Sequence, residues 1–533
     1  MIALNLLFNF FKHSIRFFNT IKHLRSTQAY YRIMNKFKRF LYKNCTPKIK
    51  AYPKSVSWGN RLYNTKSFLG PLHFTFINQE KKYSEKIDWN CQSYGKLWAY
   101  NLNYFDFLNQ EDISKEEGLT LIYNYIEEAS NLKDGLEPYP ISLRLINWIK
   151  FISKHQIHDE KIDKILAKHL SLLNKNLEYH LLGNHLLENA FALLFGAYYF
   201  GDETIYRTSK KLLVSELNEQ ILNDGGHFEL SPMYHQLILT RLLDCINLVD
   251  NNRWKKDDLL KMIKEKAGRM LGWLHEIKYQ NGQVPLVNDS AYGIAACSKE
   301  IFDYAKILKL KTHKSSLSDS GYRRWNEGHA EMLMDMGQIG PDYIPGHAHA
   351  DTFNFEFLFK GRPIIVDTGI STYEKNSRRQ LERSTESHNT IRVDGKDSSE
   401  VWGGFRVARR AKIISFKEEE NKIVATHDGY KRIGALHTRS FSKLDQKVII
   451  EDIIESKKSH QIESFLHFHP DCNIRVEEDK IKVDSDITIA FKNHRNLIVE
   501  EYDFPLGYNR TKKACKIRTS TEKKSKIEIS YEN

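Results

Sequence analysis

The hydrophobic pattern of the sequence changes near residue 320, and this change limits the folds that the chain can adopt. From about residue 90, apolar residues recur three and four positions apart, as in Ile165, Leu166, Leu170 and Leu173. This spacing is typical of amphipathic helices. After about residue 320 the apolar runs are short or alternate with polar residues, and Gly, Asp and Asn separate them. Such runs predict closely spaced strands. We therefore expect a helical region followed by a β-region.

Repeated helices dominate the first region. The pattern predicts helices over about 184–200, 204–221 and 232–249, separated by short turns that contain Gly or Asp. Antiparallel helix pairs of this length are typical of a helical bundle, solenoid or toroid. In the second region, many short strands favour an antiparallel β-sandwich. The Lys-rich stretch after about residue 510 is expected to end in an edge strand.

The chain is long enough for several domains. With 533 residues, it exceeds the size at which a single hydrophobic core stops growing. We predict an α+β multidomain protein with an N-terminal extension at 1–89, a helical domain at 90–320 and an antiparallel β-sandwich domain at 321–533. The six cysteines form no C-x-x-C pair. Free thiols, which mildly favour a reducing compartment, are therefore expected.

The net charge of +13 raises the question of an anionic partner. A basic surface favours nucleic acid, an anionic membrane or an acidic polysaccharide. A Lys-rich background composition explains the charge equally well. Because no recognisable nucleic-acid-binding motif accompanies it, we do not expect a nucleic-acid partner.

The N-terminal stretch MIALNLLFNFFKHSIRFF is apolar and aromatic, but Lys12 and Arg16 interrupt it. No apolar run is long enough to span a bilayer, and a signal-peptide pattern is lacking. A cytoplasmic or membrane-peripheral location is therefore favoured over a periplasmic one. Up to about Tyr42, basic residues alternate with aromatic and aliphatic ones. This segment is expected either to lie on a membrane surface or to pack as a helix on the protein body.

A first polar cluster lies in the segment GNHLLEN. Asn184 after Gly183 is a good helix cap, which is the simplest explanation of a lone Asn. Yet His185, Glu188 and Asn189 share the first turn and a half with it, which is more polar groups than a cap needs. His185 and Glu188 are three positions apart and can meet on one helix face.

A second cluster, DGGHFELSPMYH, contains a Gly pair that opens a turn and Pro232, which is expected to begin a helix. Tyr234 would lie in the first turn of that helix. Taken alone, Tyr234 is best explained as a packed side chain whose hydroxyl needs one partner.

Histidines and carboxylates form a third group. In the extended segment GHAHAD, His347 and His349 would point to the same face. His349, Asp367 and His388 have residue types that suit zinc, and spacings of 18 and 21 residues are natural for neighbouring strands. Satisfied core histidines are the alternative explanation.

Together these segments resemble the heparinase II/III-like polysaccharide lyases. The resemblance rests on GNHLLENAFALL, DGGHFELSPMYH, GHAHADTFNFEF with the following VDTG, and RSTESHNTIRVDG. KLWAYNLNYFDFL and EPYPISLRLINWIK resemble the first helices of that family's helical domain. The resemblance covers about residues 90–470. It implies an incomplete (α/α) toroid followed by a β-sandwich, with the active site in the cleft between them.

The resemblance also implies roles for the polar clusters. Asn184 and His185 resemble the groups that neutralise the substrate carboxylate, and Glu188 resembles a supporting, substrate-binding acidic residue. Tyr234 and His347 resemble the catalytic tyrosine and histidine.

The third group then divides between catalysis and metal binding. His349, Asp367 and His388 resemble the ligands of a structural zinc ion. Arg144 and Trp148 are candidates to line the cleft and bind sugar, although a packed helix face is equally consistent with their positions. Tyr373 is the nearest candidate for a second tyrosine supplied by the β-domain.

The implied activity is cleavage of an acidic, uronate-containing glycan by β-elimination. That glycan could be its own organism's surface polysaccharide if the host is bacterial. A uronate C5-epimerase needs the same carboxylate neutraliser and two proton-transfer groups, so the sequence does not separate the two activities. A non-catalytic glycan-binding scaffold is a third hypothesis. The presence of Asn184, His185, Tyr234 and His347 together argues against it.

Overall fold

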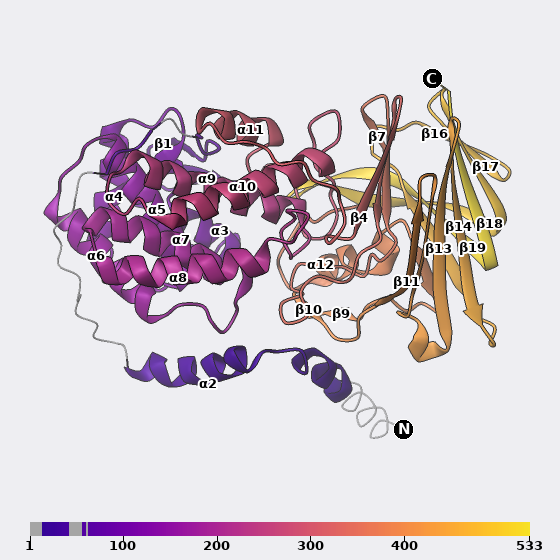
Figure 1. The fold of residues 1–533 in the computed structure, drawn as a ribbon, viewed down its shortest axis with the longest axis horizontal. Coiled ribbons are helices and arrows are strands. Elements are labelled where there is room, and N and C mark those ends of the chain that lie inside the picture. Colours follow the sequence, from indigo (N-terminus) through magenta and orange to yellow (C-terminus); the bar gives the residue numbers. More distant parts are fainter. Residues whose placement is uncertain (1–12, 42–55, 60–61, 533) are drawn as a thin grey trace.

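The computed structural model describes residues 13–41, 56–59 and 62–532. A helical body is followed by a β-body, and two short helices of the N-terminal segment lie against one side of both (Figure 1). The apolar residues 1–12, on which part of the N-terminal expectation rested, lie outside the described residues, as does Tyr42. Within the described residues, no helix is long and apolar enough to cross a membrane.

The predicted helices are present with bounds close to those expected. The segments predicted at 184–200, 204–221 and 232–249 are α7, α8 and α9. Side chains cap two of them, since Asp202 accepts a hydrogen bond at the start of α8, and Ser231 does so at the start of α9, just before Pro232. The helices of the body are α3 (Lys96–Tyr104), α4 (Lys115–Glu127), α5 (Pro138–Lys154), α6 (Glu160–Lys175), α7 (Gly183–Phe200), α8 (Glu203–Gln220), α9 (Pro232–Asn251), α10 (Asp258–Ile277) and α11 (Ser298–Ile307).

The strands fall into separate antiparallel sheets. A small sheet near the helical body contains β1 (Phe68–Gly70), β2 (His73–Phe76) and β3 (Gln79–Lys82). A four-stranded sheet contains β4 (Tyr322–Glu327), β5 (Ala330–Asp335), β6 (Phe355–Phe359) and β7 (Arg362–Ile365). The ten-stranded sheet contains β8 (Ile391–Val393), β11 (Ile413–Glu419), β12 (Lys422–His427), β13 (Ala435–Leu444), β14 (Lys447–Ser456), β15 (Ile462–His467), β16 (Ile474–Glu477), β17 (Lys480–Val483), β18 (Ile487–Gly507) and β19 (Arg510–Tyr531). β9 (Val401–Trp402) pairs with β10 (Arg406–Val407), and α12 (Ser377–Glu382) lies beside them.

The expectation of a C-terminal edge strand is wrong. β19 pairs with β14 on one side and with β18 on the other, so it lies inside the ten-stranded sheet. Its lysines are exposed or half-buried, while Ile517, Ile527 and Ile529 are buried. Period-2 alternation predicts the strand but leaves its neighbours undefined, because pairing is set by distant parts of the chain.

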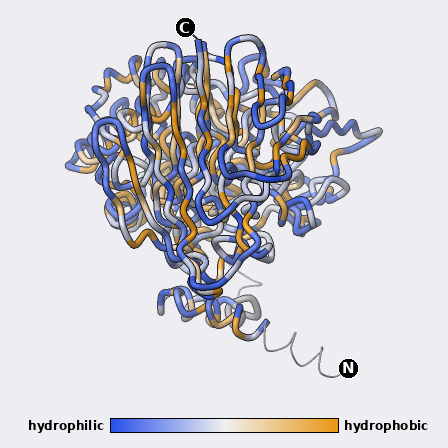
Figure 2. Tube along the Cα trace, turned by 90° about the vertical axis from the view of Figure 1, so that its right-hand side faces the viewer, coloured by the Kyte–Doolittle hydropathy of each residue, from blue (hydrophilic) through white to orange (hydrophobic). Residues whose placement is uncertain are grey.

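The four-stranded sheet joins the two bodies. From one of its faces, Met332, Phe355 and Phe357 pack into the core that it shares with the ten-stranded sheet. From the other face, Leu333 and Leu358 pack into the core of the helical body. Figure 2 shows the strands of the large sheet side by side, with hydrophobic and hydrophilic positions interleaved along them. The observed architecture is therefore a helical toroid followed by a β-sandwich.

We call residues 13–41 the N-terminal strap. It contains a helical stretch at 13–21 and α2 (Ser26–Leu41). Gln28 of α2 is buried, with an exposed fraction of 1%, and it donates to the carbonyl oxygens of Leu181 and Tyr343. Among the described residues the strap therefore packs on the protein body. This was one of the two expectations, the other being that the segment lies on a membrane surface.

Candidate active site

A cleft of about 1920 Å³ separates the helical body from the loops of the β-sandwich. Its walls come from the strap, from the first turns of α7 and α9, and from loops near residues 342–347, 373–375 and 405–410. The cleft is lined by these site residues predicted from the sequence: Asn184, His185, Glu188, Tyr234, His347 and Tyr373.

The start of α7 turns sharply so that Asn184 reaches the cleft. Gly183 has φ +58°, and a Cβ atom there would lie 2.7 Å from Glu229 Oε1 and 2.9 Å from Ile344 Cδ1. Glycine is therefore needed both for its conformation and for the close approach. Asn184 donates through its backbone N–H and through Nδ2 to Glu229, with Nδ2 3.0 Å from Oε1 and 2.8 Å from Oε2.

His185 stands beside Asn184 and is partly open to the cleft, with 35% of its side chain exposed. Its Nδ1 lies 3.2 Å from Glu178 Oε1, and its ring centroid lies 4.7 Å from that of Tyr139. Burial alone would lower the pKa of His185. The negative charge and hydrogen bond of Glu178, together with Glu229 and Glu188, outweigh burial and raise the pKa above its ordinary value. The site thus favours an imidazolium beside Asn184.

Tyr234 faces groups from the β-sandwich. Its ring centroid lies 3.9 Å from that of His347, and its hydroxyl oxygen lies 3.0 Å from the hydroxyl oxygen of Tyr373. Burial raises the pKa of Tyr234 well above its ordinary value, and the nearby Tyr508 adds to the effect. Without a bound ligand, Tyr234 therefore keeps its proton at neutral pH and is set to donate it.

One carboxylate, Asp289, links the two histidines of the GHAHAD segment. His347 Nδ1 lies 2.8 Å from Asp289 Oδ2, and His349 Nε2 lies 2.9 Å from Asp289 Oδ1. Arg379 donates to both oxygens of the same carboxylate, at 2.5 Å and 2.7 Å. Although burial would raise the pKa of Asp289, Arg379 and the histidines hold it well below its ordinary value. The Asp289 carboxylate thus places a proton on His347 Nδ1 and leaves Nε2 3.4 Å from Glu229.

The residues expected to bind zinc lie together beneath the cleft. His349, Asp367 and His388 are fully buried, and His388 Nδ1 lies 3.0 Å from Asp367 Oδ2. His349 and His388 have ring centroids 5.2 Å apart. Among the described residues, the set whose ligand atoms all lie within 4.8 Å of one another is Asp351, Asp367 and His388, so Asp351 joins two of the predicted residues, and the predicted His349 lies outside this set.

Unpaired polar atoms at this position fit a metal ion. Within the part of the chain that the structure describes, His349 Nδ1, His388 Nε2 and Asp351 Oδ2 are buried and have no hydrogen-bond partner. Buried polar atoms without partners are costly. Two imidazole nitrogens with two carboxylates are also a donor set that suits zinc. The donor set therefore fits the ion that the resemblance implies.

Glu188 forms an ion pair at the floor of the cleft. Its Oε1 lies 2.8 Å from Arg241 Nε, and Arg241 also lies 3.4 Å from Asp244 Oδ2. Burial raises the pKa of Glu188 more than Arg241 lowers it. Because its carboxylate is occupied by Arg241, Glu188 contributes to the cleft mainly by holding that arginine in place.

The expectation that Arg144 and Trp148 line the cleft is wrong. Both side chains are fully buried. Arg144 donates to the carbonyl oxygens of Asn103 and Gly135, and Trp148 packs edge-on against Phe105. The physical reason is that every residue of α5 from 140 to 152 is buried. Where α5 reaches the cleft it does so through other residues, among them Tyr139, Leu143 and Lys150, so the packed-helix alternative holds for Arg144 and Trp148.

Several polar residues at the site were missed in the sequence. Glu229 belongs to the DGGHFELSPMYH segment and could have been found there. Asp289 and Arg379 lie outside the clusters, in a loop and a short helix, and only the fold brings them together. Tyr508, whose ring lies 5.2 Å from that of Tyr373, comes from the β18–β19 turn and carries no local signal either.

Comparison with protein families supplies independent information. Residues 140–313 match the family model described as "Heparinase II/III N-terminus", and residues 310–532 match "Heparinase II/III-like, C-terminal". The chain is 22% identical over 315 residues to a heparin-sulfate lyase of Bacteroides stercoris, a match that covers 52% of this chain and 45% of that protein. It is 24% identical over 245 residues to a heparin-sulfate lyase of Pedobacter heparinus, covering 40% and 36%. The matches thus span less than half the length of these curated relatives.

Solved structures share the fold. A crystal structure of a heparinase III superposes with a TM-score of 0.61 at 15% identity, covering 81% of this chain and 77% of that one. A heparan sulfate lyase from Pedobacter heparinus superposes with a TM-score of 0.54 at 18% identity, covering 86% and 81%. The toroid followed by a β-sandwich is therefore the architecture that these proteins have in common.

Proposed function

The chain belongs to the heparinase II/III family, and from this premise we propose that it is a polysaccharide lyase that cleaves a uronate-containing glycosaminoglycan by β-elimination. The observation that carries the proposal is the convergence of Asn184, His185, Tyr234 and His347 on one cleft. The names of the relatives point to heparan-type glycans as the first substrates to test.

Asn184 and His185 bind the carboxylate of the uronate in the proposed reaction. The proton at C5 is weakly acidic while that carboxylate carries a full charge, because removal of the proton adds a second negative charge beside it. An imidazolium at His185 and an amide N–H of Asn184 stabilise the charge that develops on the carboxylate oxygens. The raised pKa of His185 supports this role, since it keeps the ring charged at higher pH.

His347 and Tyr234 divide the proton transfers. His347 accepts the C5 proton at Nε2, because Asp289 already occupies Nδ1. The electron pair of the C5–H bond forms the C4–C5 double bond, and the C4–O bond breaks. Tyr234 donates its proton to the leaving oxygen, a role that its raised pKa supports. Tyr373, 3.0 Å from the Tyr234 hydroxyl, orients that proton.

The zinc ion implied by the family would be held by His388, Asp367, Asp351 and His349. When bound, it supplies a fixed positive charge that orders the loops of the β-sandwich next to the cleft. We propose a structural role because neither His347 nor Tyr234 belongs to the donor set, which contacts His347 through Asp289.

A uronate C5-epimerase is the competing activity, because it begins with the same proton abstraction. Elimination creates an unsaturated uronate that absorbs in the near ultraviolet, and epimerisation does not. We expect absorbance to rise when the purified protein is incubated with heparan sulfate or with another uronate polymer of a panel. Incorporation of deuterium at C5 in heavy water without a rise in absorbance would instead establish the epimerase.

A further inference from the structure

The N-terminal strap is fastened to the helical wall of the cleft. Arg32 Nε donates to the carbonyl oxygen of His180 at 3.3 Å, and Asn35 Nδ2 lies 3.2 Å from Nδ1 of the same histidine. Tyr31 stacks on Tyr179 with ring centroids 4.7 Å apart and an interplanar angle of 25°. Residues 179–180 lie shortly before Asn184, so the strap lies next to the proposed carboxylate pocket.

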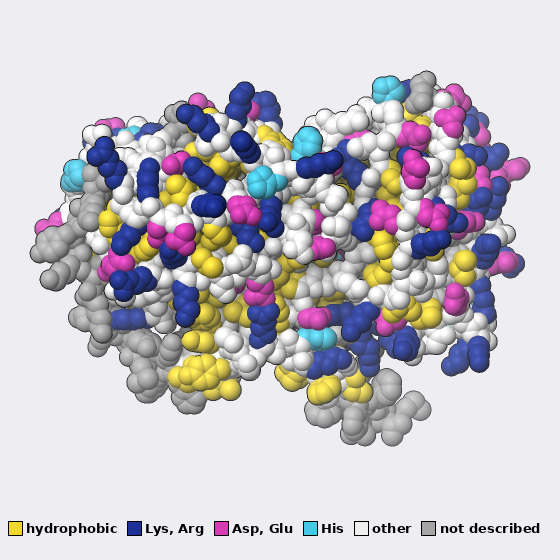
Figure 3. Space-filling view, viewed as in Figure 1, with side chains coloured by type: hydrophobic (Ala, Val, Ile, Leu, Met, Phe, Trp, Pro, Cys, Tyr) yellow, Lys and Arg dark blue, Asp and Glu magenta, His cyan; other side chains and the backbone are white. Residues whose placement is uncertain are grey.

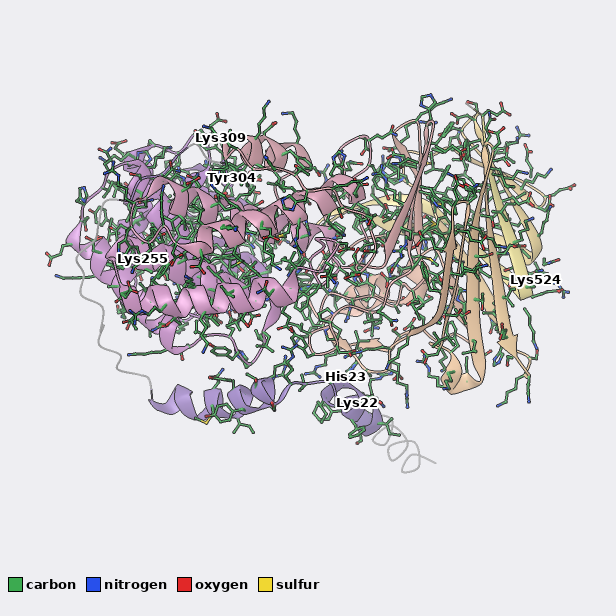
Figure 4. The ribbon with its side chains drawn as sticks, in the orientation of Figure 1. Lys22, His23, Lys255, Tyr304, Lys309 and Lys524 are labelled. Atoms are coloured by element: carbon green, nitrogen blue, oxygen red, sulfur yellow. The ribbon has the colours of Figure 1, made fainter. Side chains whose placement is uncertain are left out.

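The same strap is fastened to the β-sandwich wall. Gln28 Nε2 donates to the carbonyl oxygen of Tyr343 at 3.2 Å, and Trp402 Nε1 donates to Thr20 Oγ1 at 3.1 Å. Arg25 lies over the ring of Tyr343 at 3.8 Å. Figure 4 places Lys22 and His23 on the strap, beneath the junction of the two bodies. The strap therefore bridges both sides of the cleft and forms part of its lining.

Two arginines line the cleft near the strap and have no carboxylate partner among the residues that the structure describes. Arg32 comes from the strap and Arg406 from β10, and both line the cleft. Within the described residues neither forms an ion pair, whereas Arg25 of the strap pairs with Glu219. Arg406 instead lies over the ring of Trp402, 4.7 Å from its centroid.

The positive charge of Arg406 acts on Arg32. Burial lowers the pKa of Arg32, and the positive charge of Arg406 lowers it further. Figure 3 shows Lys and Arg side chains gathered on the β-body where it meets the strap. A pair of like charges without counterions is unfavourable, and an anion placed between them relieves the repulsion.

We infer that Arg32 and Arg406 form an anion-binding subsite that holds a charged group of a sugar next to the one being cleaved. The inference rests on the proposed function and names a specificity determinant for it. The shared ligand chemistry is a sulfate or a carboxylate on an acidic polysaccharide, both of which match the planar fork of arginine. Arg32 precedes residue 140, where the family match begins, so the strap contributes a binding residue from outside the matched region.

The test measures oligosaccharide binding directly, in a variant that is expected to bind the oligosaccharide without cleaving it. Oligosaccharides of heparan sulfate and unsulfated uronate oligosaccharides of equal length are titrated calorimetrically into Tyr234→Phe protein. Arg32→Gln and Arg406→Gln are added to this background, singly and together. Lys22→Gln is the matched control, because it removes one positive charge from the strap at an exposed position outside the cleft lining.

We expect each arginine variant to weaken binding by about tenfold, the scale of one charge-assisted hydrogen bond, and the control to change it little. A loss confined to the sulfated oligosaccharide identifies sulfate as the ligand, and a loss with both identifies the carboxylate. Arg32→Lys should restore part of the affinity. Melting temperatures check that the strap stays docked in every variant, because Arg32 donates to His180 and Arg406 lies over Trp402, which donates to Thr20 of the strap.

Equal affinity of the parent and the double variant would overturn the subsite while leaving the lyase proposal intact. If the control Lys22→Gln weakened binding as much as the arginine variants, the subsite would also be overturned. The loss of affinity would then come from the lower overall positive charge of the strap and not from a specific site. Conversely, weakened binding by the double variant would sustain the subsite even if the wild-type protein formed no unsaturated product, a result that would refute the lyase. A parent protein that binds neither oligosaccharide would contradict both proposals.

Discussion

The ring of Tyr234, in the first turn of α9, lies 3.9 Å from the ring of His347, in the loop between β5 and β6. The contact joins the helical body to the β-sandwich across the cleft. Any change in the relative position of the two bodies would separate these groups. The proposed catalytic arrangement therefore depends on the interface between the two bodies, which the four-stranded sheet and the N-terminal strap both contact.

The Asp289–His347 contact predicts a non-additive pair of substitutions. Asp289→Asn removes the charge that holds the proton on His347 Nδ1, and we expect turnover to fall by about 10²-fold, the scale of one acid–base group. In a His347→Gln background the same substitution should cost little more, because the group it positions is already gone. Kinetics of the two single variants and the double variant measure the coupling.

A purely structural role for Asp289 would give a different result. Its loss leaves Arg379 buried without its partner, so lower stability is expected in any case. Activity is therefore compared per folded molecule, by scaling to the folded fraction from thermal melts. If the two losses of turnover simply add, Asp289 does not act through His347.

The pH dependence of activity should carry the signature of His185. Its pKa is raised, so the imidazolium persists above the pH at which a free histidine would lose its proton. Activity should decline as pH rises through this raised pKa, and His185→Gln should have low activity without that decline. The stabilisation that comes with the raised pKa has the same sign: it is complete below the unfolded-state pKa and is lost as pH rises through the folded-state value. A profile of kcat/KM in which the wild type and His185→Gln share the same alkaline limb would assign that limb to another group.

Metal content tests the buried donor set. We expect about one zinc ion per chain in the purified protein, and less in His388→Ala and in Asp351→Asn. Chelation should lower the melting temperature, because an ion bound only by the folded state stabilises it. Tyr234→Phe, which lies outside the donor set, is the matched control and should retain its zinc. Full zinc content in Asp351→Asn would restrict the ligands to His349, Asp367 and His388.

Substitution of Trp148 tests whether this residue is part of the core, as the structure shows, and not part of a sugar-binding surface, as the sequence suggested. Trp148→Ala deletes a fully buried ring and should lower the free energy of unfolding by about 3–5 kcal/mol. Activity per folded molecule should change little, since the side chain does not reach the cleft. A variant with wild-type stability and weakened substrate binding would return Trp148 to the binding surface. Denaturant unfolding and Michaelis–Menten kinetics on the same preparation distinguish the two outcomes.

Much of the fold was predictable because its signals are local. The helical period of the segments at 184–200 and 232–249 depends only on neighbouring residues, and the observed helices match it closely. The pairing of β19 inside its sheet was not predictable, because strand neighbours are chosen by long-range contacts. The same holds for Arg144, whose helix face is defined by the packing around α5 and not by its own sequence.

The candidate site divides in the same way. Asn184, His185 and Tyr234 stand in contiguous segments of the sequence, and it is the resemblance of those segments to the heparinase II/III-like family that implies their roles, since Tyr234 taken alone is best explained as a packed side chain. Asp289 and Arg379 complete the site through a salt bridge between residues 90 positions apart, and no spacing rule predicts such a partner. Buried counter-charges of this kind are recognised by their burial and by the distance between them, which only the folded chain defines.

The most direct test of the account is the near-ultraviolet absorbance of a uronate polymer incubated with wild-type protein and with Tyr234→Phe. The account predicts that the wild type generates unsaturated product and that Tyr234→Phe folds normally, as its melting temperature reports. The variant should form product at least about 10²-fold more slowly, because it lacks the proton for the leaving oxygen. Wild-type turnover by Tyr234→Phe on a polymer that the wild type cleaves would contradict the mechanism. Absence of unsaturated product from the wild type with every polymer of the panel would contradict the proposed function itself.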